Sequence, residues 1–170
     1  MPVAIIIMQW SKLKSRVKDL ICPELHGVID FHVTQYRKAH SWISEAWVTV
    51  NGERIFDCGS RTYARELAYE FLASKASRNA ELVEILKRRE IHEPQQMGEA
   101  MRAYLDMSVA EALKSDNPFI KALAIVDRRV GKRTIEKLNI DDSEHSLVRA
   151  FYELRCAKTN IKQIAQPEAQ

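Results

Sequence analysis

The chain has 170 residues, and its 26 lysines and arginines against 23 aspartates and glutamates give a formal net charge of +3. Because 46% of the residues are hydrophobic, the composition excludes a disordered chain, and the length fits one domain or a small domain with a helical extension. Five glycines and five prolines exclude collagen-like and low-complexity proteins. The mild net charge is by itself no argument for nucleic-acid binding.

A helix is expected first, because apolar residues recur with a period of 3.6 over residues 9–21 and lysines and arginines fill the outer face. Residues 28–37 then alternate between apolar and polar side chains, which predicts a half-buried strand. The run before this helix, residues 3–8, is apolar but too short to cross a membrane, and it lacks the basic start of a signal peptide. It is either a buried strand or, as we favour, an upstream extension.

Asn51-Gly52 lies between two strand-like runs and predicts a two-residue type I′ hairpin. The expected register places Val48 opposite Ile55 and Trp47 opposite Phe56. A second helix is expected over residues 61–77, capped by Ser60, and another after Asn79 up to the run Lys87-Arg88-Arg89. The apolar stripe of the second helix, which we expect to be buried, consists of Ala64, Leu67, Ala68, Phe71 and Leu72.

The chain beyond the polar stretch 90–96 is helical in pattern. Helices are expected over residues 98–114, 119–130, 132–138 and 145–162, with Gly131 just after a helix end and Asp141 or Ser143 as the last cap. We therefore predict an α+β fold: an N-terminal α-β-β-β-α unit with a three-stranded antiparallel sheet, followed by a helical C-terminal part. The expected units are residues 9–92 and, packed on them, residues 97–163, with residues 1–7 and 164–170 flexible or accessory.

No motif in the chain specifies a reaction. The five histidines include no i,i+4 pair and no HExxH, and neither a nucleophile elbow nor a glycine-rich phosphate loop occurs. We therefore assign no catalytic residue and expect no metal and no cofactor. Cys22, Cys58 and Cys156 are odd in number and lack CxxC spacing, which predicts free thiols and a cytoplasmic protein.

Two positions nevertheless invite a chemical interpretation. His32 shares the polar side of its strand with Tyr36, and this row is either a solvated sheet face or the wall of a pocket. Asp127 falls on the apolar face of the expected helix 119–130. It is either a buried acid facing a pocket, or it accepts backbone N–H groups or pairs with an arginine to hold the following turn. A basic patch surrounds it: Arg128, Arg129, Lys132 and Arg133.

Several short segments together resemble one family. They are Met8-Gln9-Trp10-Ser11-Lys12-Leu13-Lys14, Cys22-Pro23, Gly27, Phe31-His32, Tyr36-Arg37, Ala124, Asp127-Arg128-Arg129, Gly131-Lys132-Arg133, Phe151-Tyr152 and Arg155-Cys156. With them the chain resembles an uncharacterised family of short bacterial proteins from about Met8 to Ile161. Because that family has no established activity, the resemblance assigns no functional residue.

A second resemblance is topological and covers residues 9–76. The order helix, three strands, helix, with Ala46, Val48, Val50 and Asn51-Gly52 in the second strand and turn and a basic start to the second helix, is similar to the double-stranded-RNA-binding domain. The resemblance implies that this helix start lies on RNA phosphates. The RNA-contacting residues would then be Arg61, Thr62, Arg65 and His40.

These observations predict a non-catalytic protein that binds a macromolecule, with structured RNA as the most specific version. The alternative ligand is another protein, as for an immunity-type or regulatory protein, and the acidic stretch 90–113 would be the binding surface. A small enzyme with a site around Asp127, His32 and Tyr36 is the third interpretation.

Overall fold

The computed structural model describes residues 9–36, 43–74 and 79–161. It confirms the predicted α+β fold, with one helix before three antiparallel strands and helices after them. The elements are α1 (Trp10–Lys18), η1 (Pro23–Leu25), β1 (Ile29–Tyr36), β2 (Ile43–Val50), β3 (Glu53–Gly59), α2 (Ser60–Ser74), α3 (Asn79–Arg88), α4 (Pro94–Leu105), α5 (Val109–Ala112), α6 (Pro118–Ile125), α7 (Lys132–Glu136) and α8 (Ser146–Thr159).

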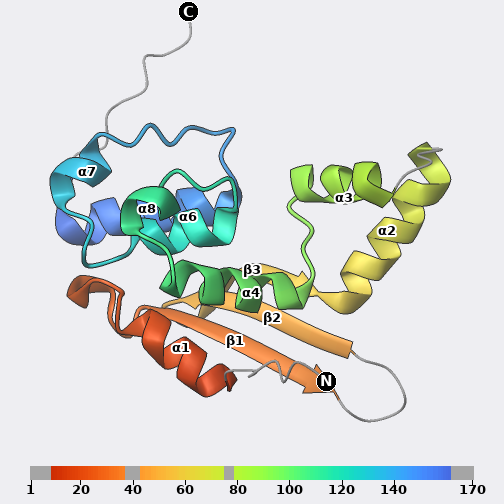
Figure 1. Cartoon of the computed structure of the whole chain (residues 1–170), viewed down its shortest axis with the longest axis horizontal. Helices are drawn as coiled ribbons and strands as arrows, with labels where there is room; N and C mark the ends of the chain where they lie inside the picture. Colours follow the sequence, from red (N-terminus) through yellow and green to blue (C-terminus); the bar gives the residue numbers. More distant parts are fainter. Residues whose placement is uncertain (1–8, 37–42, 75–78, 162–170) are drawn as a thin grey trace, which may run out of the picture.

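The helices divide into two groups on either side of α4. Figure 1 shows α6, α7 and α8 together at one end of the molecule and α2 and α3 as an arm at the other, with α4 between them over the sheet. Contacts join α4 to α1, β2 and α6, whereas α2 contacts α3, β2 and β3. No helix in the described ranges is both long and apolar enough to cross a membrane.

The sheet has the strand order β1-β2-β3. Positive φ angles at Asn51 (52°) and Gly52 (82°) confirm the predicted type I′ turn. The predicted side-chain register is wrong beyond the turn, because a β-bulge between Val48 and Thr49 adds a residue to β3. Val48 therefore lies opposite Phe56, and both side chains are buried.

The core is one cluster of buried apolar side chains that extends from α1 to α8. Its largest fully buried members on α4 are Met97, Met101 and Tyr104, and on α8 Phe151. Tyr104 is buried although it carries a polar hydroxyl, so that group needs a hydrogen-bond partner inside the protein.

Three boundaries of the C-terminal helices differ from the expected ones. The expected helix over residues 98–114 is two helices, because Ser108 and Glu111 form a capping box that starts α5. The helix α6 begins at Pro118, with the Asn117 side chain accepting two backbone N–H groups, but it ends at Ile125. Gly131 precedes α7 with φ of −72°, so it is an N-cap and not the expected residue after a helix.

The largest departure concerns α2, whose apolar stripe is not buried. Tyr69, Phe71 and Leu72 are 64%, 58% and 79% exposed, and Ala64 and Ala68 are exposed as well. The predicted burial of this stripe is wrong because α2 packs on α3 through its other side.

We predict opposite effects for alanine at two glycines. Gly52→Ala should lower the free energy of unfolding by about 1 kcal/mol, since φ of +82° is strained for any residue with a Cβ. Gly98→Ala, in the middle of α4, should raise it by about 0.5–1 kcal/mol, because alanine favours a helix and its Cβ would meet Arg102 only at ordinary contact distance. Urea unfolding of both variants measures the two effects, and a destabilised Gly98→Ala would contradict the placement of α4.

Candidate functional site

Asp127 is 1% exposed and lies just beyond the end of α6. Its carboxylate accepts hydrogen bonds from the Arg129 backbone N–H (2.7 Å), Nε (3.1 Å) and Nη2 (2.7 Å), and from the Tyr104 hydroxyl. Burial alone would raise the pKa of Asp127, but the hydrogen bonds from Arg129 and Tyr104 outweigh it and hold that pKa below its ordinary value. The contact with Arg129 is one of the two arrangements that the sequence left open.

The same turn is tied to the end of α1. The Cys22 N–H donates to the Val126 carbonyl, and the Arg128 N–H donates to the Leu20 carbonyl, both at 2.8 Å. The Asp127 carboxylate therefore holds a turn at which three parts of the chain meet, and it satisfies the buried hydroxyl of Tyr104. This is a structural role.

The predicted basic patch is smaller than expected, because Arg129 is engaged with Asp127. Arg128, Lys132 and Arg133 are exposed around the same turn.

The predicted RNA-contacting residues lie at the start of α2, apart from His40, which is outside the described residues. Arg61 and Thr62 are exposed. Arg65 is also exposed, but its guanidinium donates to the Glu66 carboxylate from Nε (3.1 Å) and Nη2 (3.0 Å). The helix start is therefore not uniformly basic.

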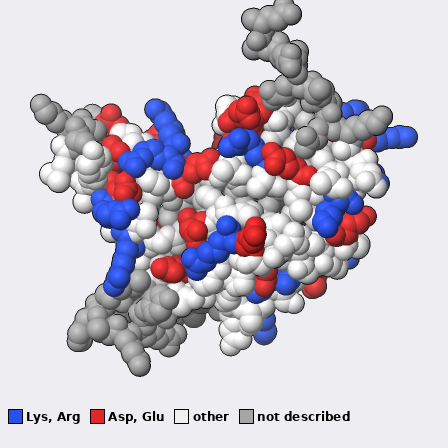
Figure 2. Space-filling model, turned by 180° about the vertical axis from the view of Figure 1, so that it is seen from behind, with Lys and Arg blue, Asp and Glu red and all other residues white. Residues whose placement is uncertain are grey.

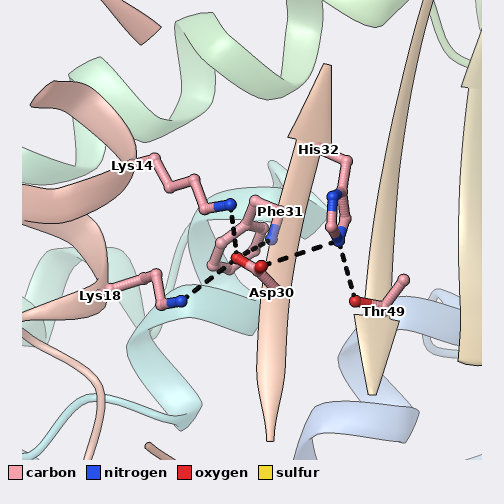
Figure 3. A network of polar contacts seen from close by, with 6 residues as sticks. All are labelled: Lys14, Lys18, Asp30, Phe31, His32 and Thr49. Atoms are coloured by element: carbon pink, nitrogen blue, oxygen red, sulfur yellow. Dashed lines mark hydrogen bonds and ion pairs between the residues drawn. The ribbon is translucent and has the colours of Figure 1, made fainter. Parts of the chain in front are cut away.

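His32 belongs to a polar network on β1 that Figure 3 shows from close by. Its Nε2 lies 3.0 Å from the Thr49 hydroxyl and 3.8 Å from the Asp30 carboxylate. That carboxylate contacts Lys14 at 2.8 Å and Lys18 at 3.3 Å, so it joins α1 to the edge strand. Burial would raise the pKa of Asp30, but Lys14, the Phe31 N–H and Lys18 together hold it below the ordinary value.

Beside this network, three side chains stack on one another on the outer face of the sheet. The His32 ring lies parallel to Trp47, with centroids 5.1 Å apart, and the Arg54 guanidinium lies 4.0 Å from the Trp47 centroid. His32 and Asp127 thus have separate sets of partners, and the Tyr36 side chain lies outside the described part of the chain. These contacts do not combine His32, Tyr36 and Asp127 into one site.

The structure instead forms a cleft that the sequence did not predict. We call it the α3–α6 cleft; its volume is about 930 Å³, within the range of roughly 300–1,000 Å³ typical of ligand sites. Its floor is α4, one wall is α3, and the other wall is the start of α6 with the residues before α8. The lining residues used below are Glu84, Lys87, Arg88, His92, Glu99, Ala103, Asp116, Lys121, Glu144 and His145.

Two histidines close one end of this cleft. His145 is the N-cap of α8, and its Nδ1 accepts a hydrogen bond from the Leu147 N–H at 3.1 Å. Nδ1 therefore carries no proton, so the proton of the neutral ring is on Nε2, which lies 3.0 Å from Nε2 of His92. We assign His145 as the donor and His92 as the acceptor from this network.

Both histidines are held in the neutral form. His92 is 5% exposed, and its ring lies 5.1 Å from Phe119 and 5.8 Å from Phe56, between centroids. Burial lowers the pKa of His92 to about 4, with a further contribution from His145, and burial also lowers the pKa of His145.

The N-terminus of α8 receives a second side-chain cap. Glu90 follows α3 with φ of 56°, and its carboxylate accepts a hydrogen bond from the Ser146 N–H at 2.6 Å. His145 and Glu90 thus satisfy adjacent N–H groups of one helix and connect it to the residues after α3. Sequence reasoning expected Asp141 or Ser143 as the cap; it missed this pair because Glu90 and Ser146 are 56 positions apart.

We predict that Asp127→Asn lowers the free energy of unfolding by roughly 2–3 kcal/mol, because both buried carboxylate oxygens accept hydrogen bonds from Arg129 or Tyr104 and an amide NH2 cannot accept any. Tyr104→Phe should cost about 1 kcal/mol for one hydrogen bond. The control is Asp106→Asn at an exposed position, which should stay within about 0.5 kcal/mol of the wild type. Urea unfolding measures all three, and equal effects of Asp127→Asn and Asp106→Asn would contradict the assignment.

We also predict that the protein loses stability as the pH falls from about 6.5 to about 4. In this window the unfolded state binds a proton at His92 and the folded state does not, so the free energy of unfolding decreases with falling pH, by roughly 3 kcal/mol. Glu90, Asp30 and Asp127, whose pKa values are lowered, act in the same direction at lower pH.

The matched variants are His92→Phe, which should remove the contribution of His92 and leave that of His145, and His26→Gln at an exposed histidine, which should keep the full decline. Urea unfolding at a series of pH values gives the curves. A decline as steep in His92→Phe as in the wild type would refute the neutral, buried state of His92.

Comparison with known proteins supplies the family. A family model for the SF0329 protein family matches residues 9–156, from the residue before α1 into α8. Neither a curated protein nor a solved structure matches the chain. The family match spans most of the chain and confirms the family resemblance seen in the sequence, so the chain belongs to the SF0329 protein family.

Proposed function

We propose that the protein binds a segment of another polypeptide in the α3–α6 cleft. The observation that carries this proposal is the cleft itself: it is of ligand-binding size and open, and each of its two walls carries both acidic and basic side chains. Alanines on α4 form part of the floor, and Ala103 is exposed there. A chain segment can therefore approach the floor closely between the walls.

The charges of the cleft favour a ligand of mixed charge. On the α3 wall, Arg88 is exposed, and no hydrogen bond or ion pair joins its side chain to another residue in the described ranges. The same holds for Glu99 on the floor and Asp116 on the opposite wall. A segment that places an acidic side chain at Arg88 and a basic side chain at Asp116 would pair an exposed charge on each wall. These two ion pairs would fix the orientation of the segment in the cleft.

Structured RNA is less well supported as the ligand. In the cleft, the four carboxylates of Glu84, Glu99, Asp116 and Glu144 outnumber the three cations of Lys87, Arg88 and Lys121, and a net negative charge disfavours phosphates. On the face drawn in Figure 2, basic and acidic side chains are interspersed, whereas nucleic-acid binding favours a stripe of one sign. Among the RNA-contacting residues that the sequence predicts, Arg65 is paired with Glu66.

A cytoplasmic location belongs to the same proposal. Cys22, Cys58 and Cys156 are free and buried. Unpaired thiols are typical of proteins in a reducing compartment. The partner would then be another cytoplasmic protein.

The test is selection of peptides from a displayed library of random sequences, followed by fluorescence anisotropy with the enriched peptides. We expect enriched peptides that carry both an acidic and a basic residue. Ala103→Trp should abolish binding because the indole fills the floor of the cleft, and Arg88→Glu should weaken peptides selected on the wild type at least tenfold, about 1.4 kcal/mol.

The matched control is Ala157→Trp, which places the same side chain at an exposed position of α8 away from the lining residues and should bind peptides normally. Unchanged binding by Ala103→Trp would refute the cleft as the site. Salt-sensitive binding of a duplex RNA, lost in the double variant Arg61→Ala and Arg65→Ala, would favour the RNA interpretation instead.

A further inference from the structure

The outer face of α2 carries large exposed hydrophobic side chains. We define it by Ala64, Ala68, Phe71 and Leu72, bordered by Arg61, Arg65 and Tyr69. Three of the four large hydrophobic side chains that are exposed in the described ranges lie between positions 69 and 72. Such a cluster is uncommon on a surface that only meets water.

The neighbouring helix cannot cover this face, because it already packs on the opposite side of α2. Glu66 and Glu70 point toward the α3 end, where Arg89 contacts both carboxylates, with 2.8 Å to Glu66. At about 100° per residue, Ala68 lies half a turn away from the direction of these two glutamates. Within the described ranges, the packing of the arm in Figure 1 therefore leaves the outer face of α2 free of contacts with α3.

We propose that this face pairs with the same face of a second copy of the chain, with the two α2 helices antiparallel about a twofold axis at Ala68. Small side chains occupy the N-terminal half of the face and large ones the C-terminal half. Antiparallel pairing places Leu72 of each copy opposite Ala64 of the other, so that large side chains meet small ones. Parallel pairing would oppose large to large and small to small.

The charges favour the same direction. About this axis, Arg65 of each copy lies opposite Phe71 of the other, where a guanidinium can lie over the aromatic ring. In parallel pairing the two copies of Arg65 would lie opposite each other and repel each other.

The area is sufficient for a reversible dimer. Side chains of this size bury about 200 Å² each, so the exposed parts of Tyr69, Phe71 and Leu72 amount to roughly 400 Å² per copy. With both copies and the flanking alanines and arginines, the contact approaches the roughly 1,200 Å² at which specific interfaces begin. A closed twofold pair also leaves no further copy of the face exposed.

Sedimentation equilibrium of the full chain over a range of concentrations tests the proposal. The mass of the wild type should rise from 19.6 kDa toward twice that value with concentration. Leu72→Glu should remain monomeric. The substitution should not impair folding, because the Leu72 side chain is 79% exposed. Ala157→Glu adds the same charge at an exposed position of α8 and should dimerise like the wild type.

Disulfide trapping tests the direction of pairing. The native cysteines are buried, so Ala68→Cys and Ala64→Cys each present a single accessible thiol. Oxidation by air with copper phenanthroline should link Ala68→Cys into a covalent dimer at least tenfold faster than Ala64→Cys, since only position 68 lies opposite itself.

A wild type that stays at 19.6 kDa at every concentration, or a Leu72→Glu variant that still dimerises, overturns the proposal. Equal trapping at both positions overturns the antiparallel arrangement. The result is independent of the cleft, because Ala103→Trp should dimerise normally and Leu72→Glu should keep its peptide binding.

Discussion

The buried side chains of α4 contact the sheet and α1 on one side and α6 on the other, and the remaining elements are positioned by this packing. Met97 and Met101 fill the space between the layers, and Tyr104 carries a hydroxyl into the same core. That hydroxyl would be costly to bury alone, and it is satisfied by the Asp127 carboxylate, which in turn is held by Arg129. One hydrogen-bonded acid therefore connects the central helix with the turn between α6 and α7.

The buried side of α4 belongs to the core, whereas its exposed side forms part of the α3–α6 cleft. Because α3 stands on one side of it and the start of α6 on the other, the helix becomes the floor of the α3–α6 cleft. The histidine pair and Glu90 hold the N-terminus of α8 at the end of this cleft. The cleft and the α8 N-terminus are thus built from the same contacts, so protonation of His92 would disturb both at once.

The arm of α2 and α3 is attached differently from the other helices. Leu82 and Leu86 of α3 are buried but are not part of the main core cluster, and the ion pairs of Arg89 join the two helices at their surface. Because α3 packs against only one side of α2, the outer face of α2 with Phe71 and Leu72 remains exposed. The proposed partner of that face and the proposed ligand of the cleft are independent of each other, because the two surfaces share no residue.

The α+β class, the order of one helix, three strands and further helices, and the type I′ turn at Asn51-Gly52 could all be predicted from the sequence. These features depend on side-chain period and on the φ angles that neighbouring residues allow, which are local properties. Three features depend on contacts between distant parts of the chain and could not be predicted in this way: the bulge at Ile55, the pairing of Asp127 with Arg129 and Tyr104, and the contact of His92 with His145. The tertiary structure also decided that the apolar stripe of α2 faces outward, because a helical pattern shows that an apolar face exists but not which other element meets it.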